Sequence, residues 1–364
     1  MSFKGNYKSI LEIVRNEIES GKQVFGTIMP TETDLANRYN VSRPTIAKVY
    51  NTLQEEGYVI KKPGTGTTVT HKSRKQKFTF GLLLPGAGES EIFSIISERF
   101  LSHSQSGKFD CLWEGTTTSD ATMRRELIEK CANDYITQKV NGVFFAPLER
   151  VNDAEELNLK ICEKLRNAGI PIVLIDRDIV EFPLRSGFDL VGLDNFNAGY
   201  SMGEHLIKMG CEHIHFFYRP DSAYSVRLRL YGVAAALRHY NLNFGKDNDI
   251  CGNPEDLDFV QNISYTRGKT GIVCANDSTA AVLMSSLDAV DVKIASDVLV
   301  CGYDDMKYAK HLKYTLTSYR QPCEEITDTA IDLMIRRINN IDSAPLLANI
   351  TGKIIVRESS RFKS

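Results

Sequence analysis

The order of apolar and polar positions over residues 30–53 predicts two short helices joined by a tight turn at Asn40. Thr31 and Ser42 each stand where an N-cap side chain is expected, and Asp34 follows Thr31 at the capping-box spacing. Apolar residues recur at helical spacing in both segments and indicate a shared core. They are Leu35, Ala36 and Tyr39 in the first helix and Ile46, Val49, Tyr50 and Leu53 in the second.

The opposite side of the second helix carries short polar and basic residues suited to DNA phosphates and base edges. An ordinary helical hairpin with a solvated polar face is the alternative. Strand patterns over residues 57–60 and 67–70 flank a Lys-Lys-Pro-Gly-Thr-Gly tip and predict a two-stranded wing, which favours a winged helix-turn-helix. The expected DNA contacts are Thr33, Ser42, Arg43, Thr45, Lys48, Asn51, Lys62, Gly64, Thr65 and Gly66.

From Phe78 onward, continuous apolar strands alternate with amphipathic helices, which predicts an α/β fold with parallel sheets covered on both faces. A second series of strands begins at Leu190, so we expect two lobes with a cleft between them. The chain is expected to cross between the lobes near residues 181–189 and 318–320. The predicted domains are a winged helix-turn-helix over residues 1–70, a basic linker over 71–77 and a two-lobed domain over 78–364.

Polar residues follow several predicted strands, where ligands of parallel sheets bind. Carboxylate, amide and guanidinium groups suit a sugar, because each hydroxyl donates and accepts a hydrogen bond. Strand-end residues alternatively cap the helix that follows, and we favour that role for Asn195 and Asp305. The ligand candidates are Asp176, Arg177, Arg229, Asn276, Asp277 and Asp304.

The charges are unevenly distributed, although the net charge is only −2. Residues 1–77 hold 13 Lys and Arg against 7 Asp and Glu, so a basic head precedes an acidic body. This pattern is typical of a nucleic-acid reader attached to another domain. Residues 71–77 suit either a linker that lies along phosphates or a soluble tether.

Other chemistry is poorly supported. Cys211, His213 and His215 alternate and offer plausible zinc donors, but we expect them to be structural and predict no metal. Hydrolase, nucleotide-binding and metalloprotease motifs are absent, so we expect neither an enzyme nor a cofactor. The eight cysteines lack Cys-x-x-Cys spacing, and no apolar run reaches membrane-spanning length. With no signal-peptide pattern, a cytoplasmic location is expected.

The head resembles the GntR type of winged helix. The similarity lies in Tyr7, Pro-Thr-Glu at residue 30, Leu-Ala at 35, Val-Ser-Arg at 41, Glu-Gly-Tyr at 56 and Gly-Thr-Gly-Thr at 64. This family usually carries Arg at the position of Thr33 and often at that of Ala47. Only the Arg43 position matches, so the resemblance implies fewer DNA contacts or contacts displaced onto Lys48.

The segment from Phe78 to Arg361 resembles the LacI and periplasmic sugar-binding family. The similar stretches include Asn-Gly-Val-Phe-Phe-Ala-Pro, Ile-Pro-Ile-Val-Leu-Ile-Asp-Arg, Cys-Ala-Asn-Asp-Ser-Thr-Ala and Val-Cys-Gly-Tyr-Asp-Asp. The resemblance implies that the six ligand candidates hold a sugar and that Phe93 stacks on it. A GntR-type head on such a body resembles the arabinose-repressor group of bacterial regulators.

These features together predict a sugar-responsive transcriptional regulator, with repression favoured. We expect a homodimer on a palindromic DNA operator and a neutral monosaccharide effector, with arabinose or another pentose or 6-deoxyhexose favoured. A non-regulatory sugar-binding protein and a sugar-metabolising enzyme with an accessory DNA-binding head are the alternatives.

Overall fold

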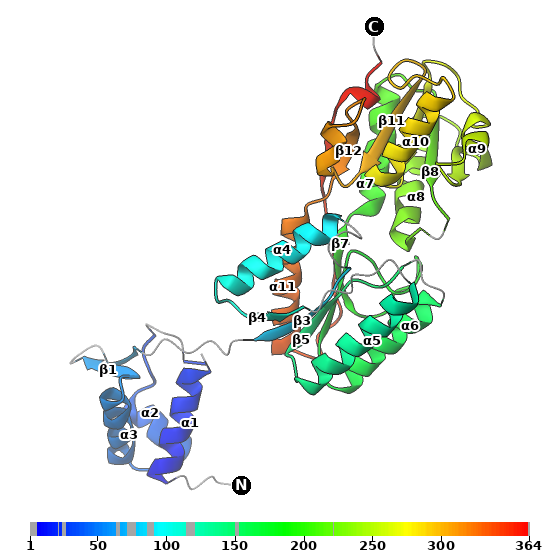
Figure 1. The fold of residues 1–364 in the computed structure, drawn as a ribbon. Coiled ribbons are helices and arrows are strands. Elements are labelled where there is room, and N and C mark those ends of the chain that lie inside the picture. The colour runs from blue at the N-terminus through cyan, green and yellow to red at the C-terminus, as the bar shows by residue number, and fades with distance from the viewer. Residues whose placement is uncertain are drawn as a thin grey trace. The chain divides into compact units, whose positions relative to one another are not determined.

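The computed structural model describes residues 6–20, 22–23, 27–62, 66–70, 78–85, 91–113, 121–149, 153–220 and 222–362. The chain divides into two compact units, Met1–Phe78 and Thr79–Ser364 (Figure 1). Helices and strands alternate through most of the second unit. No helix in these described ranges is both long and apolar enough to cross a membrane.

The first unit is a helical domain whose helices share one apolar core. The predicted capping box is confirmed, because Thr31 Oγ1 accepts from the Asp34 N–H at 3.2 Å. Asn40 ends the second helix in the left-handed region (φ 53°), which produces the predicted turn. Ser42 occupies the predicted N-cap position of α3, but its hydroxyl hydrogen-bonds to Thr45 Oγ1 at 2.9 Å and makes no capping bond to the backbone. The helices are α1 (Tyr7–Glu19), α2 (Glu32–Tyr39) and α3 (Arg43–Glu55).

The predicted wing is formed by β1 (Val59–Lys62) and β2 (Gly66–Val69), which pair antiparallel. A short segment around Ile28 pairs with Thr68 on the other side of β2 and was not predicted. One bridging residue is too short to produce an alternating pattern. Gly64, Thr65 and the predicted linker lie outside the described residues.

The second unit contains two six-stranded sheets among the described residues, and we call them and their helices the N-lobe and the C-lobe. The N-lobe sheet has the order β13-β7-β6-β5-β3-β4 and is parallel throughout. Its strands are β3 (Thr79–Leu83), β4 (Asp110–Leu112), β5 (Gly142–Phe145), β6 (Ile172–Ile175), β7 (Asp189–Leu193) and β13 (Leu347–Ile350).

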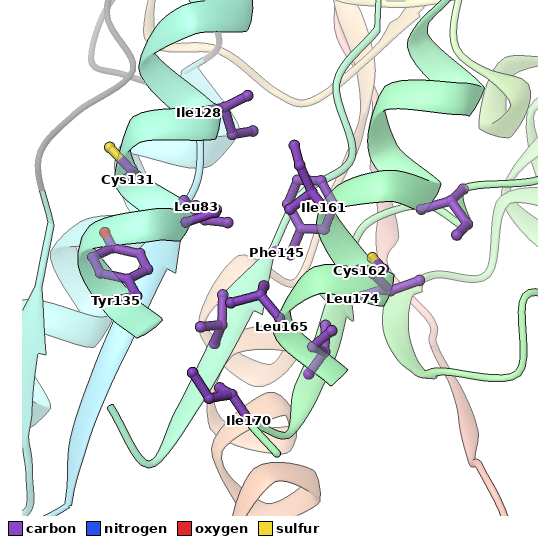
Figure 2. Close-up of a cluster of buried hydrophobic side chains, with 14 of the residues drawn as sticks. Leu83, Ile128, Cys131, Tyr135, Phe145, Ile161, Cys162, Leu165, Ile170 and Leu174 are labelled. Carbon is purple, nitrogen blue, oxygen red and sulfur yellow. The ribbon is translucent and has the colours of Figure 1, made fainter. Parts of the chain in front are cut away.

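Helices cover both faces of the N-lobe sheet. On one face, α5 (Ala121–Thr137) and α6 (Ala154–Asn167) bury an apolar cluster against β3, β5 and β6 (Figure 2). On the other face, α11 (Cys323–Asn339) packs against α4 (Glu91–Gln105) and the central strands. Central strands buried on both sides explain the continuous apolar runs of the sequence.

The C-lobe repeats this layering. Its sheet has the order β14-β12-β11-β10-β8-β9, in which only the β12–β14 pair is antiparallel. Helices α7 (Asn195–Lys208) and α8 (Tyr224–His239) pack on one face, and α9 (Leu257–Gln261) and α10 (Asp277–Ala289) on the other. The strands are β8 (His213–Tyr218), β9 (Asp249–Cys251), β10 (Thr270–Cys274), β11 (Val298–Tyr303), β12 (Thr317–Arg320) and β14 (Lys353–Ile355). The predicted α/β fold class is confirmed.

The predicted start of the second lobe at Leu190 is wrong. β7 pairs with β6 and β13 and therefore belongs to the N-lobe sheet. In the described chain, the lobes are joined after β7, between β12 and α11, and between β13 and β14. The first connection lies beyond the predicted residues 181–189, and the third was missed. Strand periodicity does not report which sheet a strand joins, because that choice depends on distant partners.

Candidate functional site

The recognition helix α3 presents most of the predicted DNA-contacting residues to solvent. Arg43 is 71% exposed in its side chain. Ser42, Lys48 and Asn51 are exposed as well. Thr45 is half-buried, and Thr33 is exposed on α2. The apolar side of α3 is buried in the domain core, so this polar surface is the side free to meet another molecule.

Glu32 restrains the basic residues beside this surface. Its carboxylate accepts from Arg43 Nε at 3.2 Å and from Lys61 Nζ at 3.3 Å. Lys61 also donates to Asn51 Oδ1 at 2.7 Å. Lys61, which was not among the predicted DNA contacts, thus lies against α3. The Lys62 side chain lies outside the described part of the chain.

On the N-lobe side of the interlobe region, Arg177 joins two carboxylates at the end of β6. Its Nε lies 3.2 Å from Asp176 Oδ2, and its NH1 donates to Glu149 Oε2. The Arg177 guanidinium carbon lies 5.7 Å from the Phe93 ring centroid. Burial opposes the charge of Arg177, but Glu149 and Asp176 raise its pKa above the usual value. Glu149 was not predicted, since it lies beyond Pro147 and Leu148 and not directly at the end of β5.

On the C-lobe side, the buried Arg229 is fixed by three contacts. Its Nε donates to Asn195 Oδ1 at 2.8 Å, and its NH1 donates to the Ala275 carbonyl at 2.6 Å. Its guanidinium carbon lies 4.5 Å from the Tyr303 ring centroid. The capping role predicted for Asn195 is wrong, because Asp194 caps α7 and Asn195 orients Arg229 instead.

Two glycines let α7 and α8 approach closely enough to place Arg229. A Cβ at Gly199 would lie 2.0 Å from the Arg229 carbonyl oxygen, and one at Gly232 would lie 2.1 Å from that of Phe196. Only glycine leaves room for these backbone contacts. The helix pair therefore sets the position of Arg229 through its backbone.

Asp304 directly follows β11, and charges of both groups act on it. Its Oδ1 accepts from Gln321 Nε2 at 2.6 Å. Burial raises the pKa of its carboxyl, and Asp176 and Glu149 add to this rise, while Arg229 and the Gln321 bond oppose it. Because both lobes contribute charges that act on Asp304, the structure brings this part of the predicted site together. We call Glu149, Asp176, Arg177, Arg229 and Asp304 the cleft cluster.

The remaining candidates have other bonding partners. Asn276 caps α10, and its Oδ1 accepts from the Thr279 N–H at 2.8 Å. Asp277 is fully buried, and its two carboxylate oxygens accept from Ser318 Oγ at 2.7 Å and the Met306 N–H at 2.9 Å. In this structure Asp277 therefore supports the loop that carries Asp304.

The capping role favoured for Asp305 is also wrong. Its carboxylate accepts from Arg320 Nε at 2.6 Å and from Arg357 NH2 at 2.5 Å. Arg320 is the last residue of β12, next to the second interlobe connection, and Arg357 follows β14. Asp305 thus links the end of β12 to the segment after β14.

Two cavities adjoin the N-lobe part of the cleft cluster. One of about 600 Å³ is lined by residues of both lobes, including Glu149, Arg177 and Tyr224. A smaller one of about 200 Å³ shares Arg177 and Tyr224 and extends toward Phe196. The lining residues identified for these cavities do not include Arg229 or Asp304.

The alternative zinc site finds no support in the described ranges, where no group of three or more His, Cys, Asp or Glu is placed to hold a metal ion. His215 is buried, and its ring nitrogens lie 2.9 Å from the carbonyl oxygens of Asp247 and Ser264. Cys211 is buried in the apolar core of the C-lobe.

Known protein families match both units. Residues 6–69 match the family model of bacterial regulatory proteins of the gntR family. Residues 204–360 match that of a periplasmic binding protein-like domain.

The similarity to individual proteins extends over most of the chain. An arabinose metabolism transcriptional repressor of Geobacillus stearothermophilus is 23% identical and covers 98% of this chain and 97% of its own. One of Halalkalibacterium halodurans is 26% identical over 88% of this chain and 87% of its own. The crystal structure of the transcription regulator CcpA of Lactococcus lactis shares the fold, with a TM-score of 0.64, 20% identity and coverage of 78% and 99%. The chain thus joins a GntR-type helix-turn-helix domain to a periplasmic-binding-protein-like domain of LacI type.

Proposed function

We propose that the protein is a sugar-responsive transcriptional repressor that binds a palindromic operator as a homodimer. The main support is one chain that carries both an exposed, polar recognition helix and a buried cluster of charged side chains between two lobes. The two relatives described above are named as repressors of arabinose metabolism, which favours the same role here. A repressor acts where DNA is located, so the proposal includes a cytoplasmic location. The proposed function requires no enzymatic step.

The cleft cluster favours a neutral ligand. It combines the carboxylates of Glu149, Asp176 and Asp304 with only the two arginines Arg177 and Arg229. This excess of acid repels phosphorylated sugars, whereas hydroxyl groups match both the carboxylates and the guanidinium groups. The buried Arg177 Nε forms an ion pair with Asp176 at 3.2 Å but no hydrogen bond among the described residues, and a ligand hydroxyl would accept one from it. L-arabinose or another pentose or 6-deoxyhexose is the proposed sugar.

The test begins with a duplex that the wild-type protein selects from a random pool. We expect its affinity to fall steeply with salt, because basic side chains displace counterions from phosphates. A neutral pentose or 6-deoxyhexose is then expected to change this affinity.

Calorimetry with the free sugars and their phosphates completes the test. Turnover of the sugar would favour the enzyme alternative, and sugar binding without duplex binding would favour the non-regulatory sugar-binding protein. If a sugar phosphate binds and the free sugars do not, the proposed neutral site is wrong.

A further inference from the structure

A chain of polar side chains runs along one flank of the recognition helix α3. Glu32 of α2 accepts from Arg43 Nε, in the first turn of α3, at 3.2 Å and from Lys61 Nζ of β1 at 3.3 Å. Lys61 in turn donates to Asn51 Oδ1, in the third turn of α3, at 2.7 Å. Arg43 and Asn51 are exposed, whereas Glu32 and Lys61 are half-buried. The exposed side of α3 is therefore bonded to residues of α2 and of the wing.

Lys61 is held on several sides. Its backbone N–H donates to Gln54 Oε1 at 3.1 Å, and it pairs with Thr67 in the wing. Its ammonium nitrogen lies 5.9 Å from the centroid of the Tyr50 ring, within the range of a cation–π contact. Tyr50 is buried, and its hydroxyl donates to the Pro30 carbonyl at 2.7 Å. The core and the wing of the domain thus set the position of the Lys61 ammonium.

The contact with Lys61 determines which end of the Asn51 amide is free. A lysine ammonium has three N–H donors and no acceptor, so only the amide oxygen of Asn51 can face it. That oxygen is used within the protein. The amide nitrogen, with its two N–H donors, is the end left for another molecule.

This arrangement changes the base that an asparagine can read. A free asparagine amide pairs with adenine, because its oxygen accepts from N6 and its nitrogen donates to N7. Asn51 cannot form both bonds while its oxygen is bonded to Lys61. Guanine presents two acceptors, O6 and N7, at its major-groove edge. An amide that only donates therefore suits guanine, whereas adenine would leave its N6 donor unpaired.

We propose that Lys61 is a positioning residue that makes Asn51 read guanine instead of adenine. Lys61 fixes the amide, and the Asn51 nitrogen donates to the acceptors of a guanine in the major groove. Glu32 pairs with Lys61 and keeps its ammonium beside α3. This inference rests on the proposed operator binding and specifies the base read at one position of each half-site.

Selection of duplexes from a random pool by the full chain tests the proposal. Asn51→Ala identifies the position concerned, since the base preference there should be lost, and wild type should favour guanine at that position. Lys61→Met keeps an unbranched side chain and removes the ammonium, so the Asn51 amide can turn. We expect the ratio of guanine to adenine affinity at this position to fall at least about tenfold, with adenine then preferred. Lys61→Arg restores the donors and should keep guanine.

Lys48→Met is the matched control, because it removes the same charge from an exposed position of α3. It should weaken binding to all duplexes and leave guanine preferred at the Asn51 position. If Lys61→Met behaves in the same way, Lys61 only attracts phosphates and the inference is wrong. The inference is also wrong if Asn51→Ala alters no base preference. If wild type selects no duplex, the proposed operator binding itself is wrong and the inference fails with it.

Asn51→Asp provides a second test should Lys61→Met fail to fold. One carboxylate oxygen remains bonded to Lys61, and the other can only accept. The preferred base at this position should then change from guanine to cytosine, whose N4 group donates. A guanine preference that persists in Asn51→Asp would overturn the proposal.

Discussion

At the scale of single residues, the two units use their charges differently. In the head, Arg43 is largely exposed and only loosely held by Glu32, so its guanidinium remains available to a partner. In the cleft cluster, Arg177 and Arg229 are buried and bonded to protein atoms. Exposed pairs contribute little to stability, whereas removal of one member of a buried pair is costly.

Arg43→Ala should lower affinity for the selected duplex by about 1–3 kcal/mol if Arg43 contacts a guanine. A gel-shift titration at fixed salt measures this change. Arg38→Ala removes the same charge from α2 of the same domain and should cause a smaller loss, similar on all duplexes. If Arg43→Ala binds the duplex as tightly as wild type, Arg43 does not contact a base.

Arg229→Ala should weaken sugar binding by about 2–5 kcal/mol, because the half-buried carboxylate of Asp304 then loses the positive charge that acts on it. Binding to DNA without sugar should be unchanged. Calorimetry with the sugar found above gives the value, and Arg238→Ala near the exposed end of the same helix is the control. Unchanged sugar affinity in Arg229→Ala would remove Arg229 from the proposed site.

Asp277 predicts a specific pH dependence of stability. Burial raises the pKa of its carboxyl to about 8, helped by Asp304 and opposed by the bonds from Ser318 and the Met306 N–H. An unfolded Asp has a pKa of about 3.9, so the folded state binds more protons between about pH 4 and pH 8. The contribution of this residue to stability is therefore greatest below about pH 4 and is lost as the pH rises to about 8.

Asp277→Asn mimics the protonated carboxyl and should flatten this part of the profile. Its amide has the right shape to donate to Ser318 Oγ and accept from the Met306 N–H. Urea unfolding at about pH 5 and about pH 8 measures the two free energies for each protein. A pH slope in Asp277→Asn equal to that of wild type would contradict the assigned pKa.

At the scale of helices and strands, packing between neighbours fixes the functional groups. α7 and α8 meet through Gly199 and Gly232, and this contact determines where Arg229 lies. In the N-lobe, α6 begins beside the larger cavity, and residues 153–155 line that cavity. Both arrangements depend on how two elements approach each other.

Gly199→Ala should lower the free energy of unfolding by about 1–3 kcal/mol through overpacking, and it should also weaken sugar binding because α8 is displaced. Gly245→Ala is a matched control, since the nearest atom to its added Cβ is Asn248 Oδ1 at 3.9 Å. Denaturant unfolding and calorimetry test both effects. A Gly199→Ala protein as stable as wild type would show that the helices separate without cost.

At the scale of the whole molecule, the cleft cluster is bonded to the connections between the lobes. Arg229 donates a hydrogen bond to Asn195, which lies just after the first interlobe connection. Asp304 accepts one from Gln321, which lies within the second interlobe connection. A sugar that bonds to Arg229 and Asp304 therefore acts next to the segments that must bend if the lobes rotate. This arrangement supports coupling between sugar and DNA binding.

The expected coupling between sugar and operator is about 1–3 kcal/mol and must be reciprocal. Operator DNA should change the sugar affinity by the same factor by which the sugar changes the operator affinity. Calorimetry of sugar binding with and without the duplex, together with duplex titrations with and without sugar, measures both factors. Identical sugar affinities in the two conditions would exclude this coupling.

The sequence by itself determined the local features of this protein. The helical periodicity and the Thr31 capping box defined α2 and α3, and the continuous apolar runs defined most strands of the two sheets. Strand-end residues such as Asp176 and Asp304 were recognisable because the edge formed by parallel strand ends is a general binding position. These signals arise within a few turns of chain, so periodicity and residue type are sufficient to detect them.

Only the tertiary structure decided which distant groups meet. In the structure, β7 belongs to the N-lobe sheet, and Glu149 joins the cleft cluster through its bond with Arg177. Asn195 accepts a hydrogen bond from Arg229 and does not cap a helix. It also turned both oxygens of Asp277 inward toward Ser318 and Met306. Each of these outcomes depends on contacts between segments far apart in the chain, and local periodicity contains no information about the partner that a side chain will find.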